Sequence, residues 1–252
     1  MYNLLISLGA ALGLFLAITA WLGPIAAIIP ALLVFGGMYF VLARRVMQKV
    51  QVDIEQTMPM LQRREIEQAR ARLEDVKTRW GRWQFLLSGQ IDAQIGMIDY
   101  LQMKWDDALP RLEAGKWRNW GALTCIGCIH WRKGNRDAAW PFFEKATSAA
   151  PQEAIVALIW GTLLVRADRR EEALKVCDRA IQSMPKSQVL KDFQATVANK
   201  RKIETKAFPE SWLQFFPEDL AAQAMIRGRR DPPPGAPTGS GTPLNRKARR
   251  ER

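Results

Sequence analysis

Residues 120–151, WGALTCIGCIHWRKGNRDAAWPFFEKATSAAP, contain the pattern that decides the fold. Small residues stand at Gly127, Ala139 and Ala146, and the bulky Phe143 lies between the last two. Apolar residues recur at helical spacing on both sides of a polar break, and Pro151 closes the stretch. This pattern predicts two helices joined by a short turn. Gly and Ala let the two backbones approach closely, where a larger side chain would hold them apart.

The same spacing occurs once before this stretch and once after it. The three glycines are 31 and then 34 residues apart, and an alanine follows each glycine twelve residues later. The matching positions are Gly96, Ala108, Leu112 and Gly115 in the first copy, and Gly161, Ala173, Cys177, Ala180 and Pro185 in the third. Asp106, Asp137 and Asp168 lie in the polar breaks, where we expect them to cap the second helix of each pair. A fixed period of this length predicts an array of stacked helical pairs.

This pattern resembles the tetratricopeptide repeat (TPR) family. The second copy matches most fully, at Gly127, Gly134, Ala139, Phe143, Ala146 and Pro151. Two departures are that Cys177 replaces the aromatic residue of the third copy, and that the first copy is three residues short near its end. The resemblance covers residues 89–187. It implies an all-α fold with an α-solenoid of about three TPR helix pairs, a right-handed superhelix that binds proteins or peptides.

The resemblance also implies which residues line the concave face of such an array. They come from the first helix of each pair and are apolar or aromatic, with two arginines: Met97, Tyr100, Leu101, Thr124, Cys128, Trp131, Arg132, Leu158, Thr162, Val165 and Arg166. This chemistry suits an apolar partner segment that carries an acidic group, with Tyr100 and Trp131 as anchors. The Lys/Asn/Arg clamp that some relatives use for carboxyl-terminal peptides is absent. The alternative is that several of these residues pack on capping segments.

The first 43 residues contain no Asp, Glu, Lys or Arg. Since a membrane-spanning helix needs about 20 apolar residues, this length is enough for two crossings, with Gly23 and Pro24 at the turn. Arg44, Arg45 and Lys49 follow, so the positive-inside rule predicts a transmembrane hairpin in a bacterial inner membrane, with both termini cytoplasmic. One crossing plus a re-entrant segment is the alternative. A signal peptide is disfavoured, because no basic residue precedes an apolar stretch that exceeds the usual ~7–15 residues.

Residues 44–88 are polar and predict juxtamembrane and amino-terminal capping helices. Pro59 is expected to divide them, with the second helix over about 60–78. An apolar stripe recurs along that helix at Ile66, Ala69, Leu73 and Val76. We expect the stripe to pack on the first repeat, with a coiled-coil seam or a lipid-facing surface as alternatives.

Residues 188–230 predict a carboxyl-terminal capping helix and then an aromatic segment. The aromatic side chains of FPESWLQFFPED, 208–219, are expected to fold back onto the array rather than form a free binding motif. Residues 231–243 are almost all Pro, Gly, Ser, Thr and Ala, so 231–252 is expected to be a disordered basic tail. Its last cations could bind anionic lipid or nucleic acid: Arg246, Lys247, Arg249, Arg250 and Arg252.

The chain offers little catalytic chemistry. His130 is the only histidine, which argues against histidine-based triads and multi-histidine metal sites. Cys125, Cys128 and His130 form a Cys-x-x-Cys-x-His motif, but no fourth zinc ligand lies nearby in the sequence. The two cysteines also fall in the middle of a predicted helix, not at its start, where the helix dipole lowers a thiol pKa. We therefore expect a packing role for them, no cofactor or metal, and no enzymatic activity.

These observations predict an inner-membrane-anchored TPR scaffold or adaptor. It would bind protein partners through its concave face, in the assembly or recruitment of a membrane-associated complex. The formal net charge of +12 supports an alternative from another class, a nucleic-acid- or ribosome-associated factor that acts through the Arg-rich tail. Against this alternative, the tail lacks interleaved aromatics for base stacking. The sequence does not define the partner or the oligomeric state.

Overall fold

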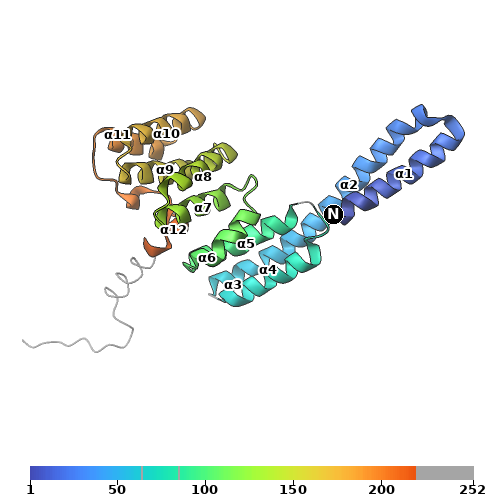
Figure 1. The fold of residues 1–252 in the computed structure, drawn as a ribbon, viewed down its shortest axis with the longest axis horizontal. Helices are drawn as coiled ribbons and strands as arrows, with labels where there is room; N and C mark the ends of the chain where they lie inside the picture. Colours follow the sequence, from blue (N-terminus) through green and yellow to red (C-terminus); the bar gives the residue numbers. More distant parts are fainter. Residues whose placement is uncertain (64, 85, 220–252) are drawn as a thin grey trace, which may run out of the picture. The chain divides into compact units, whose positions relative to one another are not determined.

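The computed structural model describes residues 1–63, 65–84 and 86–219. All regular secondary structure in these residues is helical, and they contain no β-strand. This confirms the all-α class (Figure 1). Residues 1–215 form one compact unit, and residues 216–252 form a second. The predicted disordered tail lies outside the described residues, together with the five terminal cations proposed for lipid or nucleic acid: Arg246, Lys247, Arg249, Arg250 and Arg252.

Two long apolar helices begin the chain. α1 (Tyr2–Leu22) packs along α2 (Pro24–Glu55), and the predicted turn lies between them at Gly23, whose φ of 85° favours glycine. Both helices are long and apolar enough to cross a membrane. Only 11% of each apolar window is buried, which distinguishes these helices from the core helices of a soluble domain. The second helix is longer than predicted, because it continues beyond the apolar residues to Glu55.

The juxtamembrane segment differs from the prediction. α2 ends at Glu55, before Pro59, which lies inside α3 (Thr57–Gln62). A second break follows α3, so that α4 (Ile66–Trp80) begins later than expected. Pro59 does not divide the helices because it lies in the first turn of α3, where backbone N–H groups have no intrahelical acceptor.

The end of α2 belongs to the same hydrophobic core as the helices that follow α3. Val46 and Val50 of α2 pack with Leu73 and Val76 of α4 and with apolar residues of α5 (Leu87–Leu101), among them Ile91. The apolar stripe of α4 is therefore buried inside the chain, as predicted for a cap, and does not form a coiled-coil seam or a lipid-facing surface. This shared core joins the apolar hairpin directly to the helices that follow.

The remaining helices pack in consecutive pairs, as the spacing predicted. The pairs are α5 with α6 (Trp105–Ala114), α7 (Trp120–Arg132) with α8 (Arg136–Ala149), and α9 (Ala154–Arg166) with α10 (Arg170–Ser183). α11 (Gln188–Ala198) covers α10 and α9, and the short elements η1 (Thr205–Ala207) and α12 (Trp212–Phe215) follow it. Figure 1 shows these elements in chain order.

Glycine permits the close packing inside these pairs. A Cβ placed on Gly127 would lie 2.8 Å from the Phe143 ring, and one on Gly96 would lie 2.9 Å from Leu112 Cγ. In the third pair the ring that fills this place belongs to Phe193 of α11, 2.6 Å from a Cβ on Gly161. The small–bulky spacing of the sequence thus marks real contacts between paired helices in the first two copies. In the third, an aromatic residue from the next helix packs on the glycine.

The predicted helix caps were wrong. α6 and α8 begin after Lys104 and Asn135, so Asp106 and Asp137 lie inside their first turns, and neither cap makes a side-chain hydrogen bond. Asp168 precedes the cap residue of α10 and has a left-handed φ of 63°. Carboxylates in a first turn still interact favourably with the positive end of the helix dipole.

Ion pairs join α4 to the first helix pair. Asp99 of α5 is fully buried, with Arg70 Nη1 at 3.3 Å and Arg111 Nε at 3.5 Å. Beside it, Lys77 Nζ lies 2.7 Å from Asp92 Oδ1. Burial raises the pKa of Asp99 above its ordinary value, and the attraction of Arg70 and Arg111 opposes this only in part. The buried carboxylate therefore retains a net desolvation cost when it ionises.

Asp99→Asn is expected to change how stability depends on pH. Because the folded pKa of Asp99 is raised, its contribution to stability is present below its unfolded value near 3.8 and is lost as pH rises through the folded value. The wild type should therefore lose stability relative to Asp99→Asn over that range. Unfolding free energies of both proteins, measured from acid to neutral pH, check this. If the wild type instead became more stable than Asp99→Asn as pH rises, the attraction of Arg70 and Arg111 would outweigh the desolvation of the Asp99 carboxylate.

Candidate functional site

The structure buries about half of the residues that the sequence assigned to a binding face. The side chains that are almost inaccessible to solvent are Tyr100, Thr124, Cys128, Leu158 and Thr162. Met97, Trp131 and Arg132 are partly buried, and Arg166 is exposed. Trp131 packs against Trp140, with their ring centroids 5.6 Å apart, and Arg136 lies over its ring at 4.9 Å. Trp131 is therefore part of an aromatic cluster and does not stand open as an anchor.

A segment of the chain itself occupies part of this face. The Tyr100 hydroxyl donates to the Phe215 carbonyl oxygen at 2.6 Å, and Arg132 Nη2 donates to the same oxygen at 2.8 Å. Arg132 Nη1 also donates to the Tyr100 hydroxyl at 2.7 Å, and its guanidinium lies 4.9 Å from the Trp105 ring. Burial raises the pKa of Tyr100 well above its usual value, so the hydroxyl keeps its proton and remains a donor.

Aromatic contacts hold the same segment along its length. Phe208 meets Phe193 of α11 edge to face at 5.6 Å and Trp212 at 5.0 Å. Trp212 is buried, and the Phe215 ring lies 6.1 Å from Trp120 of α7. The prediction that these aromatics fold back onto the preceding helices is therefore confirmed for residues 208–215.

An apolar cavity of about 410 Å³ adjoins this segment. We call it the apolar cavity; Met97 and Leu101 of α5 line it with Phe215 of α12, Ile54 of α2 and Leu61 of α3. The side chains that line it are all uncharged. Leu101 remains 47% exposed at this site, which is unusual for a leucine in a core helix. Sequence reasoning found Met97, Tyr100 and Leu101, but it missed Ile54 and Leu61, because no repeat pattern extends to them.

A second cavity, of about 240 Å³, lies beside α9 and the chain that follows α11. We call it the basic pocket; its lining includes four cations, Arg166, Arg170, Arg201 and Lys202, together with Thr162. Sequence reasoning predicted Thr162 and Arg166 as binding residues. It missed the other three cations, since residues 201–202 approach α9 only through the path of the chain after α11.

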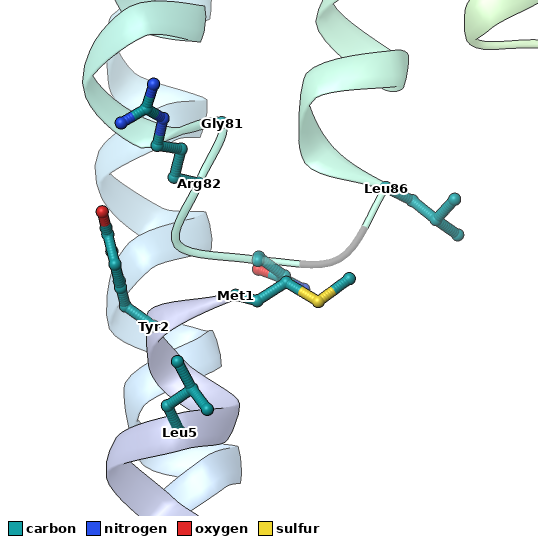
Figure 2. A pocket seen from close by; sticks show the side chains of 7 residues that line it. Met1, Tyr2, Leu5, Gly81, Arg82 and Leu86 are labelled. Carbon is teal, nitrogen blue, oxygen red and sulfur yellow. The ribbon is translucent and has the colours of Figure 1, made fainter.

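A third cavity, of about 450 Å³, lies at the start of α1 (Figure 2). Met1 lines it together with Tyr2 and Leu5 of α1, and Arg82 and Leu86 line it from the loop after α4. The Tyr2 and Asn3 amides donate to the carbonyls of Arg82 and Trp83 at 3.1 and 3.2 Å. The loop thus provides acceptors for the first amides of α1, which no helical residue could satisfy.

The cysteines are placed for packing. Cys125, Cys128 and Cys177 are free and buried. Burial raises the pKa of Cys125 well above its usual value and that of Cys177 to about 12, so both remain thiols at neutral pH. The described part of the chain contains no group of three or more His, Cys, Asp and Glu side chains that could hold a metal ion.

A comparison with models of protein families finds no match to this chain, and a comparison with curated proteins finds none either. The TPR resemblance therefore has no support from a family model or from a curated relative.

Proposed function

We propose that this protein is a membrane-anchored TPR scaffold or adaptor that binds an apolar segment of a partner protein in the apolar cavity. The role is one of binding and recruitment, without catalysis. The observation that carries the proposal is the apolar cavity itself. It lies beside residues 208–215, and the exposed Leu101 is among its lining residues.

The anchor is the apolar hairpin of α1 and α2. Its two helices are each long enough to span a bilayer. Arg44, Arg45 and Lys49 follow the apolar part of α2 and are exposed, which supports a hairpin in a bacterial inner membrane with both termini in the cytoplasm. Because the end of α2 shares a core with α4 and α5, the anchor would hold the binding surface close to the membrane. Tethering of this kind raises the effective concentration of a membrane-associated partner.

The TPR assignment is supported by contacts at the repeat positions. Gly127 lies under the Phe143 ring and Gly96 lies against Leu112, each sixteen residues apart in the sequence. These are contacts between the two helices of a pair, which is where the family places its small and bulky residues.

The partner segment is expected to be apolar where it enters the cavity. The lining residues are uncharged, so a charged side chain would lose its hydration there without gaining an ionic partner. A volume of about 410 Å³ has room for two or three apolar side chains of the size that helices present to a groove.

Leu101→Asp tests this proposal. In membranes washed at alkaline pH and treated with a crosslinker, the wild type should yield a defined crosslinked partner. Leu101→Asp should lose it by roughly tenfold or more, because a desolvated carboxylate would replace an apolar contact. Leu101 is 47% exposed, so the fold should tolerate the change.

Met103→Asp provides a matched control. Met103 is 48% exposed and lies two residues further on, outside the apolar cavity. Its left-handed φ of 61° is one that Asp tolerates. This variant should keep the crosslinked partner. Equal crosslinking by both variants would show that the partner does not bind in the apolar cavity. Release of the wild-type protein by the alkaline wash would show that α1 and α2 do not anchor it in the membrane.

A further inference from the structure

We propose that the third cavity, at the start of α1, binds the headgroup of an anionic phospholipid. We call it the amino-terminal cavity; Met1, Tyr2 and Leu5 line it together with Arg82 and Leu86. This site rests on the membrane anchor proposed above, because it needs α1 to cross a bilayer. It does not depend on what the apolar cavity binds, since the two cavities share no lining residue.

Two aromatic residues of α1 place a membrane surface at the amino-terminal cavity. Tyr2 and Trp21 lie at opposite ends of α1 and are 44% and 91% exposed. A helix of 21 residues is about 32 Å long, close to the ~30 Å thickness of a hydrocarbon core. Because Tyr and Trp concentrate at the headgroup level on both sides of a bilayer, α1 would place Tyr2 at one surface and Trp21 at the other.

The loop after α4 is held at the same level as the start of α1. The Tyr2 amide donates to the Arg82 carbonyl oxygen at 3.1 Å, and the Asn3 amide donates to the Trp83 carbonyl oxygen at 3.2 Å. The Tyr2 and Trp83 rings also meet edge to face at 5.6 Å. A loop outside the apolar hairpin therefore brings an arginine and a second aromatic ring to the level at which lipid headgroups would lie.

Positive charge gathers at this level without acidic partners. Arg44 and Arg45 lie on the part of α2 that runs beside the start of α1, because the two helices pack side by side from their common turn (Figure 1). Both are exposed, as is Arg82. Among the residues that the structure describes, no carboxylate forms an ion pair with these three arginines. The first acid of the sequence is Asp53, which pairs with an arginine of α4 at 3.2 Å.

The lining of the amino-terminal cavity is polar on one side and apolar on the other. In Figure 2, Met1 and Tyr2 lie between Arg82 and Leu5. Leu5 is about one helical turn further into the apolar part of α1 than Tyr2. Gln84 also lines the cavity, and its buried Oε1 atom has no hydrogen-bond partner within the described residues. A headgroup hydroxyl would provide the missing donor.

This arrangement fits an anionic phospholipid better than a free anion or a zwitterionic lipid. The guanidinium fork of Arg82 matches the oxygens of a phosphate, and Leu5 and Leu86 would contact the beginning of an acyl chain. The volume of about 450 Å³ falls in the usual ~300–1,000 Å³ range of small-molecule sites. The ammonium group of a zwitterionic lipid would be repelled by the nearby arginines, whereas an anionic headgroup adds no positive charge.

Native mass spectrometry of the full-length protein, released from micelles of an uncharged detergent, tests this site. With phosphatidylglycerol and phosphatidylcholine at equal concentrations, one phosphatidylglycerol per chain should be retained preferentially. Arg82→Gln should weaken its binding by roughly tenfold, the loss expected for one charged hydrogen bond. Arg79→Gln is the matched control, because it removes the same exposed charge outside the cavity, from a side chain that pairs with Asp75. It should weaken binding by less than about twofold, since salt screens exposed charges.

The anchor and the lipid site can fail separately. Arg82→Gln should melt at the wild-type temperature, stay in alkaline-washed membranes and keep the crosslinked partner, because Arg82 is exposed and lies in neither the hairpin nor the apolar cavity. If the wild type is washed out of the membrane, the anchor fails and the lipid site fails with it. If the wild type stays anchored but shows no preference for phosphatidylglycerol, only the lipid site fails.

Glycerol 3-phosphate separates a lipid from a free anion, because it carries the same phosphate without acyl chains. It should not displace phosphatidylglycerol at an equal concentration, since it leaves Leu5 and Leu86 without an apolar partner. Displacement by glycerol 3-phosphate would show that the cavity binds a free anion. Equal losses in Arg82→Gln and Arg79→Gln would show that charge attracts lipid only diffusely. Either result, or equal retention of phosphatidylcholine, would overturn the proposal.

Discussion

Gly115→Ala is expected to lower the free energy of unfolding by about 3 kcal/mol, the upper part of the range for overpacking. A Cβ on Gly115 would overlap the carbonyl oxygen of Gly89 and lie 2.5 Å from Ala93 Cβ. The reverse contact is also close, since a Cβ on Gly89 would lie 2.6 Å from the Ala114 carbonyl oxygen. The backbones of α5 and of the end of α6 are in direct contact at this crossing, so no side-chain rotation can relieve the overlap.

Chemical denaturation of the detergent-solubilised protein, followed by circular dichroism, measures this effect. Gly36→Ala is the matched control, because a Cβ on that helical glycine would meet nothing within 4 Å. This variant should not be destabilised and should gain up to about 1 kcal/mol, because alanine favours a helix interior over glycine. A similar small effect for Gly115→Ala would show that α5 and α6 separate at little cost, and that the glycines are not what allows their close approach.

Arg132→Ala is expected to release residues 205–215 from the helices that they cover. The substitution removes the donors to the Phe215 carbonyl and the Tyr100 hydroxyl, and charged hydrogen bonds of this kind contribute roughly 1.5–3 kcal/mol each. A loss of about 3 kcal/mol in local stability raises hydrogen exchange by about 100-fold when exchange follows local opening. Amide exchange in 205–215 should therefore accelerate, while that of α7 and α9 stays protected.

Two variants separate the hydrogen bonds of Arg132 from its charge. Arg132→Lys retains the charge but lacks the guanidinium fork that reaches both oxygens, so it should release the segment nearly as well as alanine. Arg136→Ala removes an arginine of the neighbouring helix that stacks on Trp131 at 4.9 Å, and it should leave exchange in 205–215 unchanged. If Arg132→Ala left this exchange unchanged as well, the aromatic contacts of Phe208 and Trp212 would suffice to hold the segment.

Release of this segment would also change the apolar cavity. Phe215 and Gln214 line the cavity on the side of α12. Their departure would widen it and uncover Tyr100, which the segment helps to bury. The exchange experiment therefore also measures how firmly one wall of the proposed partner site is held.

The sequence by itself determined the helical pairs, the apolar hairpin and the capping role of α4. Each depends on local periodicity: an uncharged run, a stripe at helical spacing, or a small residue placed sixteen positions before a bulky one. Gly127 and Phe143 show why this succeeds. Two helices joined by a short turn must meet at positions that the length of the turn fixes, so the spacing in the chain already encodes the contact.

Only the tertiary structure decided where the cavities that we propose as binding sites lie. Tyr100 and Arg132 meet Phe215 across 115 and 83 residues, and the loop after α4 meets the start of α1 at the amino-terminal cavity. Those contacts depend on the direction that the chain takes after α11 and after α4, which no period in the sequence encodes. Likewise, Ile54 and Leu61 line the apolar cavity because α2 continues beyond its apolar residues to Glu55, and α3 follows it into the core of the first helices. Local spacing fixes neighbours along a helical pair, but long-range packing decides which faces remain open.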